Sequence, residues 1–296
     1  MLRHERTEPS NVTRNTEPVH GQPGLIQTDH HAIAVNGPAG ASSLTPRDAG
    51  PGQALVADGT QPRAASMATL QGTAAFECLR LFVPAPVAEA LLSGRADRVL
   101  CPHRQEVVVL FLDLRGFTAF SETTEPEEVS RVLLEYHALI GRALKIYGGT
   151  LERFTGDGTM IFFNDPIPVP DATERAIRLA LALRDSFRRL EGLWQARGHF
   201  LGLGAGISKG YATAGLIGFD GHWDYAVIGP VTNLAARLCE LAEPAQILVC
   251  QRIFAELGER IDGDFVASTQ LKGFTRRTEI FSVRALHDPR DADGRS

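Results

Sequence analysis

Two aspartates stand where a folded chain seldom carries a charge. Asp113 directly follows the apolar run Val107–Leu112, and Asp157 lies in the turn Thr155-Gly156-Asp157-Gly158. If the strands beside them are neighbours, both carboxylates reach one place, and two adjacent carboxylates are costly unless a cation lies between them. Magnesium is commonly held by one or two carboxylates and substrate phosphates. The pair therefore predicts a metal site, although Asp-Gly is also an ordinary turn sequence and Asp113 alone could cap a turn or a helix.

A turn that could bind phosphate follows Asp113. Gly116, Phe117 and Thr118 are predicted to form it, and exposed backbone N–H groups at such a turn can bind phosphate oxygens. The sequence has no Walker pattern GxxxxGK[ST], so the turn does not by itself identify a nucleotide site.

Asn233 and Arg237 form a second polar group. They are four residues apart in the predicted helix PVTNLAARLCELA, so both side chains project from one face. An amide and a guanidinium on one face can recognise ribose and phosphate, but their spacing alone favours a solvated helix surface with an amide that caps the helix. On the residues alone, Lys272 in TQLKGFTRRTE is an exposed lysine of a turn.

Hydrophobic patterns define the elements that would position these residues. The run Val107–Leu112 is apolar on both faces, which is typical of a central strand covered on both sides. A long amphipathic helix follows, with Thr124 and Glu127 as a predicted capping box, and Gly148-Gly149 ends it. Two strands flank the Asp157 turn as a hairpin.

The rest of the sequence alternates strands with helices. A second long helix is predicted at residues 172–194, followed by a strand pair at 200–210 and 211–218. A strand at 223–229 leads into the helix of Asn233, and further strands and one short helix complete the pattern. Hairpins mixed with helices predict an α+β fold, with a mixed, mainly antiparallel sheet and helices packed on it.

Composition divides the chain into four predicted parts. Residues 1–72 are rich in Gly, Pro, Ser, Thr and Ala without an amphipathic period, which predicts a disordered arm. Residues 73–104 contain a short helical pattern and are predicted to be a linker or transducer helix, which either pairs with a partner copy or packs on its own domain. Residues 105–287 form the domain that carries the chemistry, and residues 288–296 form a flexible tail.

Bulk composition argues against several function classes. The net charge of −5 offers no basic surface for nucleic acid, so an anionic substrate needs local positive groups and metal. Four scattered cysteines without a CxxC pair predict neither a disulfide framework nor a zinc site. No run approaches the ~18 apolar residues of a membrane span, and the N-terminus lacks the apolar core of a secretory signal. We therefore expect a cytoplasmic protein without a membrane span.

Four separate motifs carry a resemblance to a known family. They are FLDLRGFTAFSE, GGTLERFTGDGTMIFF, YAVIGPVTNLAARL and LKGF, in this order. Together they resemble the catalytic domain of class III nucleotidyl cyclases, the adenylate and guanylate cyclases, from about Glu106 to Leu286. The resemblance implies the ferredoxin-like core of that family. The segment RLFVPAPVAEALLSG is also similar to the lead-in of many bacterial cyclase domains.

The resemblance implies a role for each polar residue. Asp113 and Asp157 would hold two Mg²⁺ (or Mn²⁺) ions per active site. Asn233 would position the ribose, Arg237 would stabilise charge on the α-phosphate, and Lys272 would contact phosphate. The family also implies a head-to-tail homodimer, in which each site takes the aspartates from one chain and the Asn-Arg helix from the other.

The sequence departs from the family at the two base-reading positions. Adenylate cyclases usually have a lysine where this chain has Arg153, and an aspartate or threonine where it has Ala226. Guanylate cyclases usually have a glutamate at the first position. Arg153 is a donor that suits adenine N1 as well as guanine O6, and Ala226 offers no acceptor for the adenine amino group.

Three functions follow from these observations. The first is an adenylate cyclase that converts ATP to 3′,5′-cyclic AMP and pyrophosphate in signal transduction. The second is a guanylate cyclase or one with loose base choice. The third is a catalytically silent cyclase-like domain that binds a nucleotide or a partner and regulates. All five chemistry positions are filled, which favours an enzyme, and ATP is expected by analogy with bacterial homologues.

Overall fold

The computed structural model of the protein describes residues 81–288. The predicted arm at residues 1–72 and residues 289–296 of the predicted tail lie outside the described residues. Among residues 81–288, no helix is long and apolar enough to cross a membrane.

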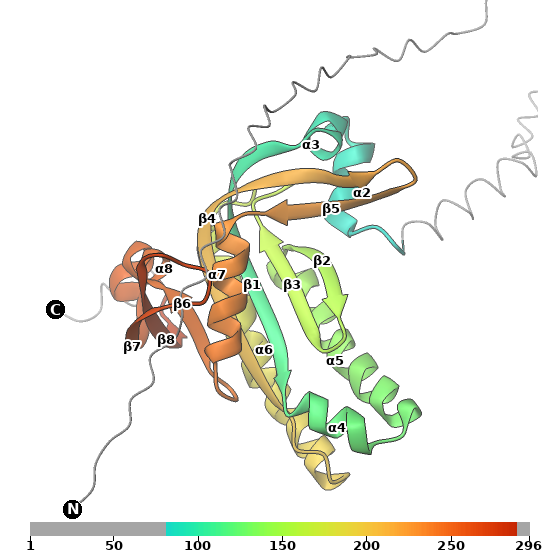
Figure 1. Ribbon diagram of the computed structural model, residues 1–296, viewed down its shortest axis with the longest axis vertical. Coiled ribbons are helices and arrows are strands. Elements are labelled where there is room, and N and C mark those ends of the chain that lie inside the picture. The colour runs from blue at the N-terminus through green and yellow to red at the C-terminus, as the bar shows by residue number, and fades with distance from the viewer. Residues whose placement is uncertain (1–80, 289–296) are drawn as a thin grey trace, which may run out of the picture. The chain divides into compact units, whose positions relative to one another are not determined.

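Strand β1 (His103–Arg115) lies in the middle of an eight-stranded sheet, between β3 (Gly158–Phe163) and β4 (Gly202–Phe219) (Figure 1). It runs antiparallel to both neighbours. Residues Val107–Leu110 and Leu112 are almost fully buried, as expected of a strand covered on both faces.

The remaining strands extend the sheet on both sides of β1. The order is β2-β3-β1-β4-β6-β8-β7, and β5 pairs with β4 beside this path. These strands are β2 (Thr150–Thr155), β5 (His222–Ile228), β6 (Ile247–Cys250), β7 (Ile261–Gln270) and β8 (Arg277–Leu286). Every strand pair within residues 81–288 is antiparallel except β4 with β6. The predicted α+β fold with a mixed, mainly antiparallel sheet is therefore confirmed.

Helices cover both faces of this sheet. Figure 1 shows α5 (Pro126–Tyr147) and α6 (Ala172–Ala196) on one side and α7 (Pro230–Leu241) on the other. Because successive side chains of β1 point to opposite faces of the sheet, Val108, Leu110 and Leu112 lie together in the core that includes α5 and α6. Val107 and Val109 face the second core, which contains residues of α7.

Shorter helices complete the described residues. They are α2 (Ala85–Leu92), α3 (Ala96–Leu100), α4 (Phe117–Thr123) and α8 (Gln251–Leu257), with a 3₁₀ turn at Gly258–Arg260. Helices α2 and α3 lie within the predicted linker at 73–104. Their buried residues Val87, Ala90 and Val99 belong to the second core, so this segment packs on its own sheet.

The predicted strand pair at 200–210 and 211–218 is wrong, because β4 is one continuous strand of 18 residues. It pairs with β1 from Gly202 to Ala214 and with β5 from Thr213 onward, so no turn separates its halves. Gly210, which was expected to end the first strand, continues the ladder opposite Val107. Continuous pairing with two partners overrides the local tendency of glycine to break a strand.

The predicted capping box of Thr124 and Glu127 is also wrong. Helix α5 begins at Pro126, its N-cap residue is Glu125, and no side chain caps it. Proline suits the first helical position because its φ is already helical and it has no N–H to satisfy. The other end of α5 is as predicted, since the helix ends at Tyr147 and Gly148 follows with a φ of 77°.

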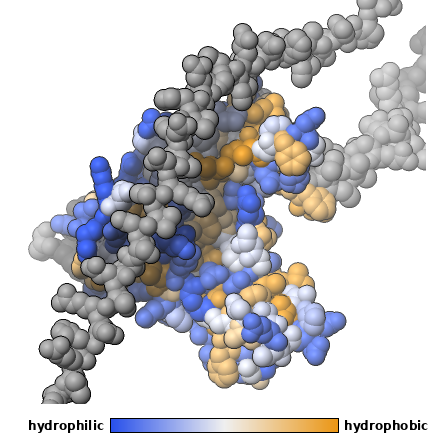
Figure 2. Space-filling model, viewed as in Figure 1, coloured by the Kyte–Doolittle hydropathy of each residue, from blue (hydrophilic) through white to orange (hydrophobic). Residues whose placement is uncertain are grey.

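Hydrophobic residues remain exposed at the β4–β5 hairpin. Phe219, Trp223 and Ile228 are 69%, 52% and 55% exposed. In the view of Figure 2, hydrophobic surface also appears near α2 and again near α4 and α5. These side chains are solvent-accessible in the single chain.

Candidate active site

Asp113 lies near the end of β1, on the face that also carries Val107 and Val109. Its side chain is 40% exposed, so Asp113 lies at the solvent-facing edge of the second core. The strand next to it, β3, pairs Leu112 with Thr159. The β2–β3 turn, which contains Asp157, therefore lies beside Asp113.

Gly158 shows how closely this turn approaches Asp113. A Cβ placed on Gly158 would lie 3.9 Å from Asp113 Oδ1 and only 2.6 Å from Thr155 Oγ1. Only glycine fits beside Thr155 without a shift. The structure thus brings the two predicted metal-binding aspartates together.

The proximity of Asp113 changes the acidity of Asp157. Burial and the negative charge of Asp113 raise the pKa of the Asp157 carboxyl to about 6, although the backbone N–H groups of Asp157 and Leu114 act in the opposite direction. A carboxyl whose negative charge is disfavoured by a neighbouring carboxylate is a suitable place for a divalent cation. Among residues 81–288, no group of three or more acidic, histidine or cysteine side chains could hold a metal. A metal at this pair would need further ligands from phosphate oxygens or water.

Arg115 is a residue of this site that the sequence analysis missed. Its guanidinium forms an ion pair with Asp113, while its Nε donates to the carbonyl of Ala242 at 2.7 Å. It also donates to the carbonyl of Cys239 at the end of α7. The available signal was its place two residues after Asp113 on the same strand, which puts both side chains on one face.

The predicted phosphate-binding turn is shorter than expected. Only Gly116 forms the turn, with a φ of 85°, and Phe117 and Thr118 already belong to α4. The first N–H groups of a helix lack intrahelical partners, so this end of α4 still presents free donors close to Asp113 in sequence. Binding of phosphate by these residues stays a prediction.

Helix α7 presents Asn233 and Arg237 on its outer side. Val231, Ala235 and Leu238 bury the opposite side of the helix, whereas Asn233 is exposed and the Arg237 side chain is 32% exposed. Arg237 Nη1 pairs with Glu240 Oε2 at 2.7 Å, one turn further along. The amide and the guanidinium therefore share a solvent-facing stripe.

The two polar groups are separate within one chain. No hydrogen bond or ion pair in the described part of the chain joins Asn233 or Arg237 to Asp113 or Asp157. Lys272 is exposed in the turn between β7 and β8 and is likewise not joined to either aspartate by such a contact within residues 81–288.

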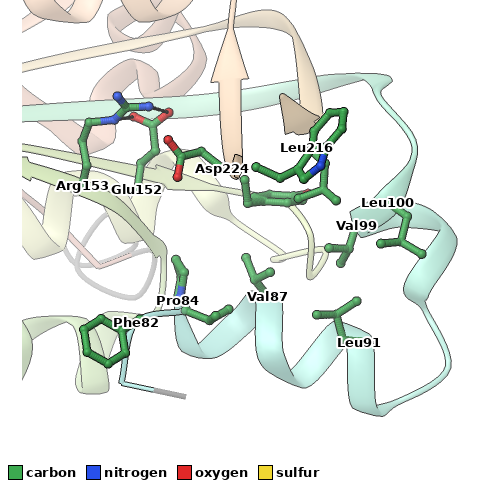
Figure 3. Close-up of a pocket in the computed structure, with 13 residues that line it drawn as sticks. Phe82, Pro84, Val87, Leu91, Val99, Leu100, Glu152, Arg153, Leu216 and Asp224 are labelled. Carbon is green, nitrogen blue, oxygen red and sulfur yellow. Dashed lines mark hydrogen bonds and ion pairs between the residues drawn. The ribbon is translucent and has the colours of Figure 1, made fainter. Parts of the chain in front are cut away.

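The two positions predicted to read the base, Arg153 and Ala226, have different surroundings. Arg153 lines a cavity of about 290 Å³ between β2, the β4–β5 hairpin and α2 (Figure 3). Ala226 of β5 is 4% exposed, pairs with Gly215 of β4, and is not among the described residues that line this cavity. Asp224, two residues earlier on the same face of β5, does line it.

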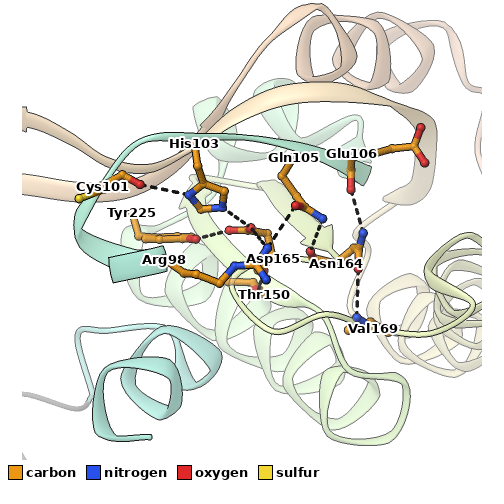
Figure 4. Close-up of polar contacts among 10 residues, drawn as sticks. All are labelled: Arg98, Cys101, His103, Gln105, Glu106, Thr150, Asn164, Asp165, Val169 and Tyr225. Carbon is orange, nitrogen blue, oxygen red and sulfur yellow. Dashed lines mark hydrogen bonds and ion pairs between the residues drawn. The ribbon is translucent and has the colours of Figure 1, made fainter. Parts of the chain in front are cut away.

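A buried carboxylate anchors β5 beside this cavity. Asp165 accepts hydrogen bonds from the Tyr225 hydroxyl and from His103 Nε2, the latter at 2.8 Å (Figure 4). Arg98 of α3 approaches the same carboxylate at 3.8 Å. The network connects α3 and the start of β1 to β5, and so holds the strand of Ala226 in place.

These positions agree with a comparison to known families. A family model described as "Adenylate and Guanylate cyclase catalytic domain" matches residues 99–284. The chain belongs to this family. The match includes both aspartates, Asn233, Arg237 and Lys272, so the cyclase domain contains every residue to which a role was assigned by resemblance.

Several named relatives of the cyclase domain are adenylate cyclases. The chain is 29% identical over 188 residues to "Adenylate cyclase 1" of Rhizobium meliloti, with 61% of this chain and 28% of the relative covered. It is 28% identical over 191 residues to "Adenylate cyclase" of Anabaena cylindrica, with 61% and 37% covered. The chain thus spans about a third of the length of these curated relatives.

Solved cyclase structures of both kinds resemble this fold. The adenylyl cyclase CyaB from P. aeruginosa is 33% identical, with a TM-score of 0.61 and coverage of 63% of this chain and 97% of that one. The guanylyl cyclase Cya2 is 29% identical, also with a TM-score of 0.61, and 64% and 96% are covered. The similarity does not separate the two substrates.

Proposed function

We propose that this chain is an adenylate cyclase that converts ATP to 3′,5′-cyclic AMP and pyrophosphate. The single observation that carries the proposal is the approach of Asp113 and Asp157 at the end of a buried strand. A divalent cation would relieve the unfavourable charge of Asp157 beside Asp113, and a nucleoside triphosphate would bring the further ligands that the cation needs. The adenylate cyclase relatives support ATP as the substrate.

Asp113 and Asp157 would hold two Mg²⁺ or Mn²⁺ ions. When bound, the metals would lower the pKa of the ribose 3′-hydroxyl and stabilise the departing pyrophosphate. The residues of this chain mainly position the substrate, because the new bond forms within one molecule. No nucleophile from the protein is required.

Positive and polar side chains would complete the site. Asn233 would orient the ribose, and Arg237 would place a fixed positive charge beside the α-phosphate. Lys272 and the N–H groups at Gly116, Phe117 and Thr118 would bind the remaining phosphate oxygens. Arg115 competes with the metals for Asp113 and would have to yield when they bind.

A homodimer would bring the two polar groups together. Within one chain Asn233 and Arg237 point to solvent without a link to the aspartates, and exposed Phe219 and Trp223 offer apolar surface for a partner. In a head-to-tail pair, each site would take Asp113 and Asp157 from one protomer and α7 from its partner.

GTP is the second candidate substrate. Ala226 has no side-chain acceptor for the adenine amino group, and the guanylyl cyclase Cya2 is as similar in fold as CyaB. A cyclase with loose base choice therefore has specific support in the departure at Ala226.

Turnover by the purified full chain tests the proposal. The protein is incubated with Mn²⁺ or Mg²⁺ and with ATP, GTP, CTP or UTP, and the products are identified by mass spectrometry. Cyclic AMP and pyrophosphate in equal amounts are the expected result. Nucleotide binding without any cyclic product would instead support the catalytically silent, regulatory reading.

A further inference from the structure

We propose that Glu152 and Arg153 together read the purine base, with Glu152 supplying the acceptor that Ala226 lacks, so that the site accepts both ATP and GTP. This inference rests on the proposed cyclase activity, whose substrate choice it specifies. It assigns a specificity-determining role to Glu152, which precedes Arg153 in the sequence and is not itself one of the two positions, Arg153 and Ala226, at which the family is expected to read the base.

A β-bulge places these two neighbours on one side of the strand. Leu151 pairs with Ile161 and Arg153 with Met160, so Glu152 is the extra residue of β2. In a regular strand Glu152 and Arg153 would point to opposite faces, but a bulge breaks this alternation. Their side chains meet, with Arg153 Nε 3.3 Å from Glu152 Oε2 and Nη2 3.3 Å from Oε1.

Burial distinguishes Glu152 from an ordinary surface glutamate. Its side chain is 6% exposed, whereas that of Arg153 is 50% exposed. Burial raises the pKa of Glu152, Asp224 adds to this effect, and Arg153 and the backbone N–H of Val227 oppose it. The Glu152 carboxylate thus lies between Arg153 and β5, the strand that contains Ala226. Ala226 is the position whose side chain offers no acceptor for the base.

The adjoining cavity suits a planar base. Glu152 and Arg153 line it together with Asp224, and apolar side chains such as Val87 and Leu216 form the other walls (Figure 3). Sites for small organic groups are typically apolar with a few placed polar groups.

The pair matches the edges of both purines. A guanidinium only donates hydrogen bonds and an ionised carboxylate only accepts them. With adenine, Arg153 would donate to N1 and Glu152 would accept from the 6-amino group. With guanine, Arg153 would donate to O6, and the two oxygens of Glu152 would accept from N1–H and the 2-amino group. Guanine uses both carboxylate oxygens, whereas adenine uses one.

That difference provides the test. Glu152→Gln keeps one acceptor oxygen and replaces the other with a donor, so it should lower kcat/KM for GTP by about tenfold or more. The value for ATP should fall by less than about threefold, because one acceptor suffices for adenine. Wild-type protein should prefer ATP over GTP by less than about a thousandfold.

Asp220→Asn is the matched control, since it removes the charge of an exposed carboxylate at the β4–β5 turn that does not line the cavity, and it should leave the ATP/GTP ratio unchanged. Circular dichroism verifies that each variant is folded. If Glu152 only held Arg153 in place, Glu152→Gln would change both substrates equally. An unchanged ratio in Glu152→Gln, or an equal change of the ratio in Asp220→Asn, overturns the assignment.

Nucleotide binding separates this inference from the proposed activity. If the wild type converts neither nucleotide, the cyclase proposal fails, and calorimetric Kd values for ATP and GTP then decide the role of Glu152. Glu152→Gln should still weaken GTP binding by about tenfold relative to ATP. An equal change for both nucleotides would overturn the base-reading role.

Discussion

Asp157 acquires its chemistry from one neighbour. In a solvated Asp-Gly turn its carboxyl would be an ordinary acid, but beside Asp113 and partly buried it has a pKa of about 6. Burial and the charge of Asp113 disfavour the negative charge of Asp157 in the metal-free protein. A divalent cation bound between the two carboxylates would offset both effects.

Removal of either carboxylate should abolish turnover without unfolding the chain. Asp113→Ala or Asp157→Ala removes one of the two protein ligands, so we expect cyclic nucleotide formation to fall at least about a hundredfold. Circular dichroism should be unchanged, because Asp113 is partly exposed at a strand end. Asp185→Ala, an exposed aspartate of α6, is the control that should keep full activity. A wild-type rate in either site variant would refute the metal assignment.

Metal affinity should depend on pH through Asp157. A proton competes with the metal for this carboxylate, so Mn²⁺ affinity should be constant above pH 6 and fall by up to about tenfold per pH unit below it. Carbon NMR of the metal-free protein would show the Asp157 carboxyl titrating near pH 6. In Asp113→Asn the neighbouring charge is gone, and the midpoint should move to lower pH. A wild-type midpoint near pH 4 would contradict the prediction.

At the scale of elements, α7 is positioned by its close approach to β4. A Cβ on Gly206 would lie 2.1 Å from the backbone N of Cys239 and 2.4 Å from the carbonyl of Ala235. The helix backbone therefore rests directly on the strand at this glycine. This contact determines where Asn233 and Arg237 lie relative to the sheet.

Gly206→Ala should displace α7. The added methyl group cannot fit without a shift of backbone, so we expect the free energy of unfolding to fall by about 1–3 kcal/mol. Turnover should fall further than stability alone explains, because Asn233 and Arg237 move with the helix. Thermal melts and steady-state kinetics measure the two effects.

Gly192→Ala is the matched control for this glycine. Gly192 lies inside α6, and a Cβ there would meet nothing within 4 Å. Alanine should raise the free energy of unfolding by about 0.5–1 kcal/mol, because it suits a helix interior better than glycine. Equal effects of the two substitutions would argue against the close packing of α7 on β4.

At the scale of the whole molecule, the single chain would supply two half-sites under the proposed function. Asp113 near the end of β1 lies beside Asp157 of the β2–β3 turn, and Asn233 and Arg237 lie on the solvent side of α7. A head-to-tail dimer would complete each half-site with the other half of the partner.

Two inactive variants should therefore rescue each other. In a mixed dimer of Asp113→Ala and Arg237→Ala chains, one site carries both lesions and the other carries none. With random pairing about half of the dimers are mixed and each has one intact site of two, so activity should recover to roughly a quarter of wild type. The assay uses equal amounts of both chains, well above the dimer dissociation constant.

Mass measurement provides the control for this experiment. Each variant alone should stay inactive at the same total concentration, and native mass spectrometry should show the mixed dimer. If mixed dimers are present and no activity returns, the sites are not shared in the proposed way.

Local patterns in the sequence determined most elements of this protein. The apolar run before Asp113 predicted a central strand, Gly148 predicted the end of α5, and the turn at Asp157 predicted a hairpin. Such features depend on residues a few positions apart, where periodicity and backbone preference act directly. The family resemblance rested on the same short motifs, which together indicate the α+β fold and the candidate site residues.

Only the tertiary structure decided how distant segments meet. The approach of Asp157 to Asp113 depends on β3 pairing with β1, and the ion pair of Arg115 with Asp113 forms beside the end of α7. The bulge at Glu152 and the continuity of β4 through Gly210 arise from pairing register. Register and long-range pairing are set by partners far away in the sequence, so local patterns do not specify them.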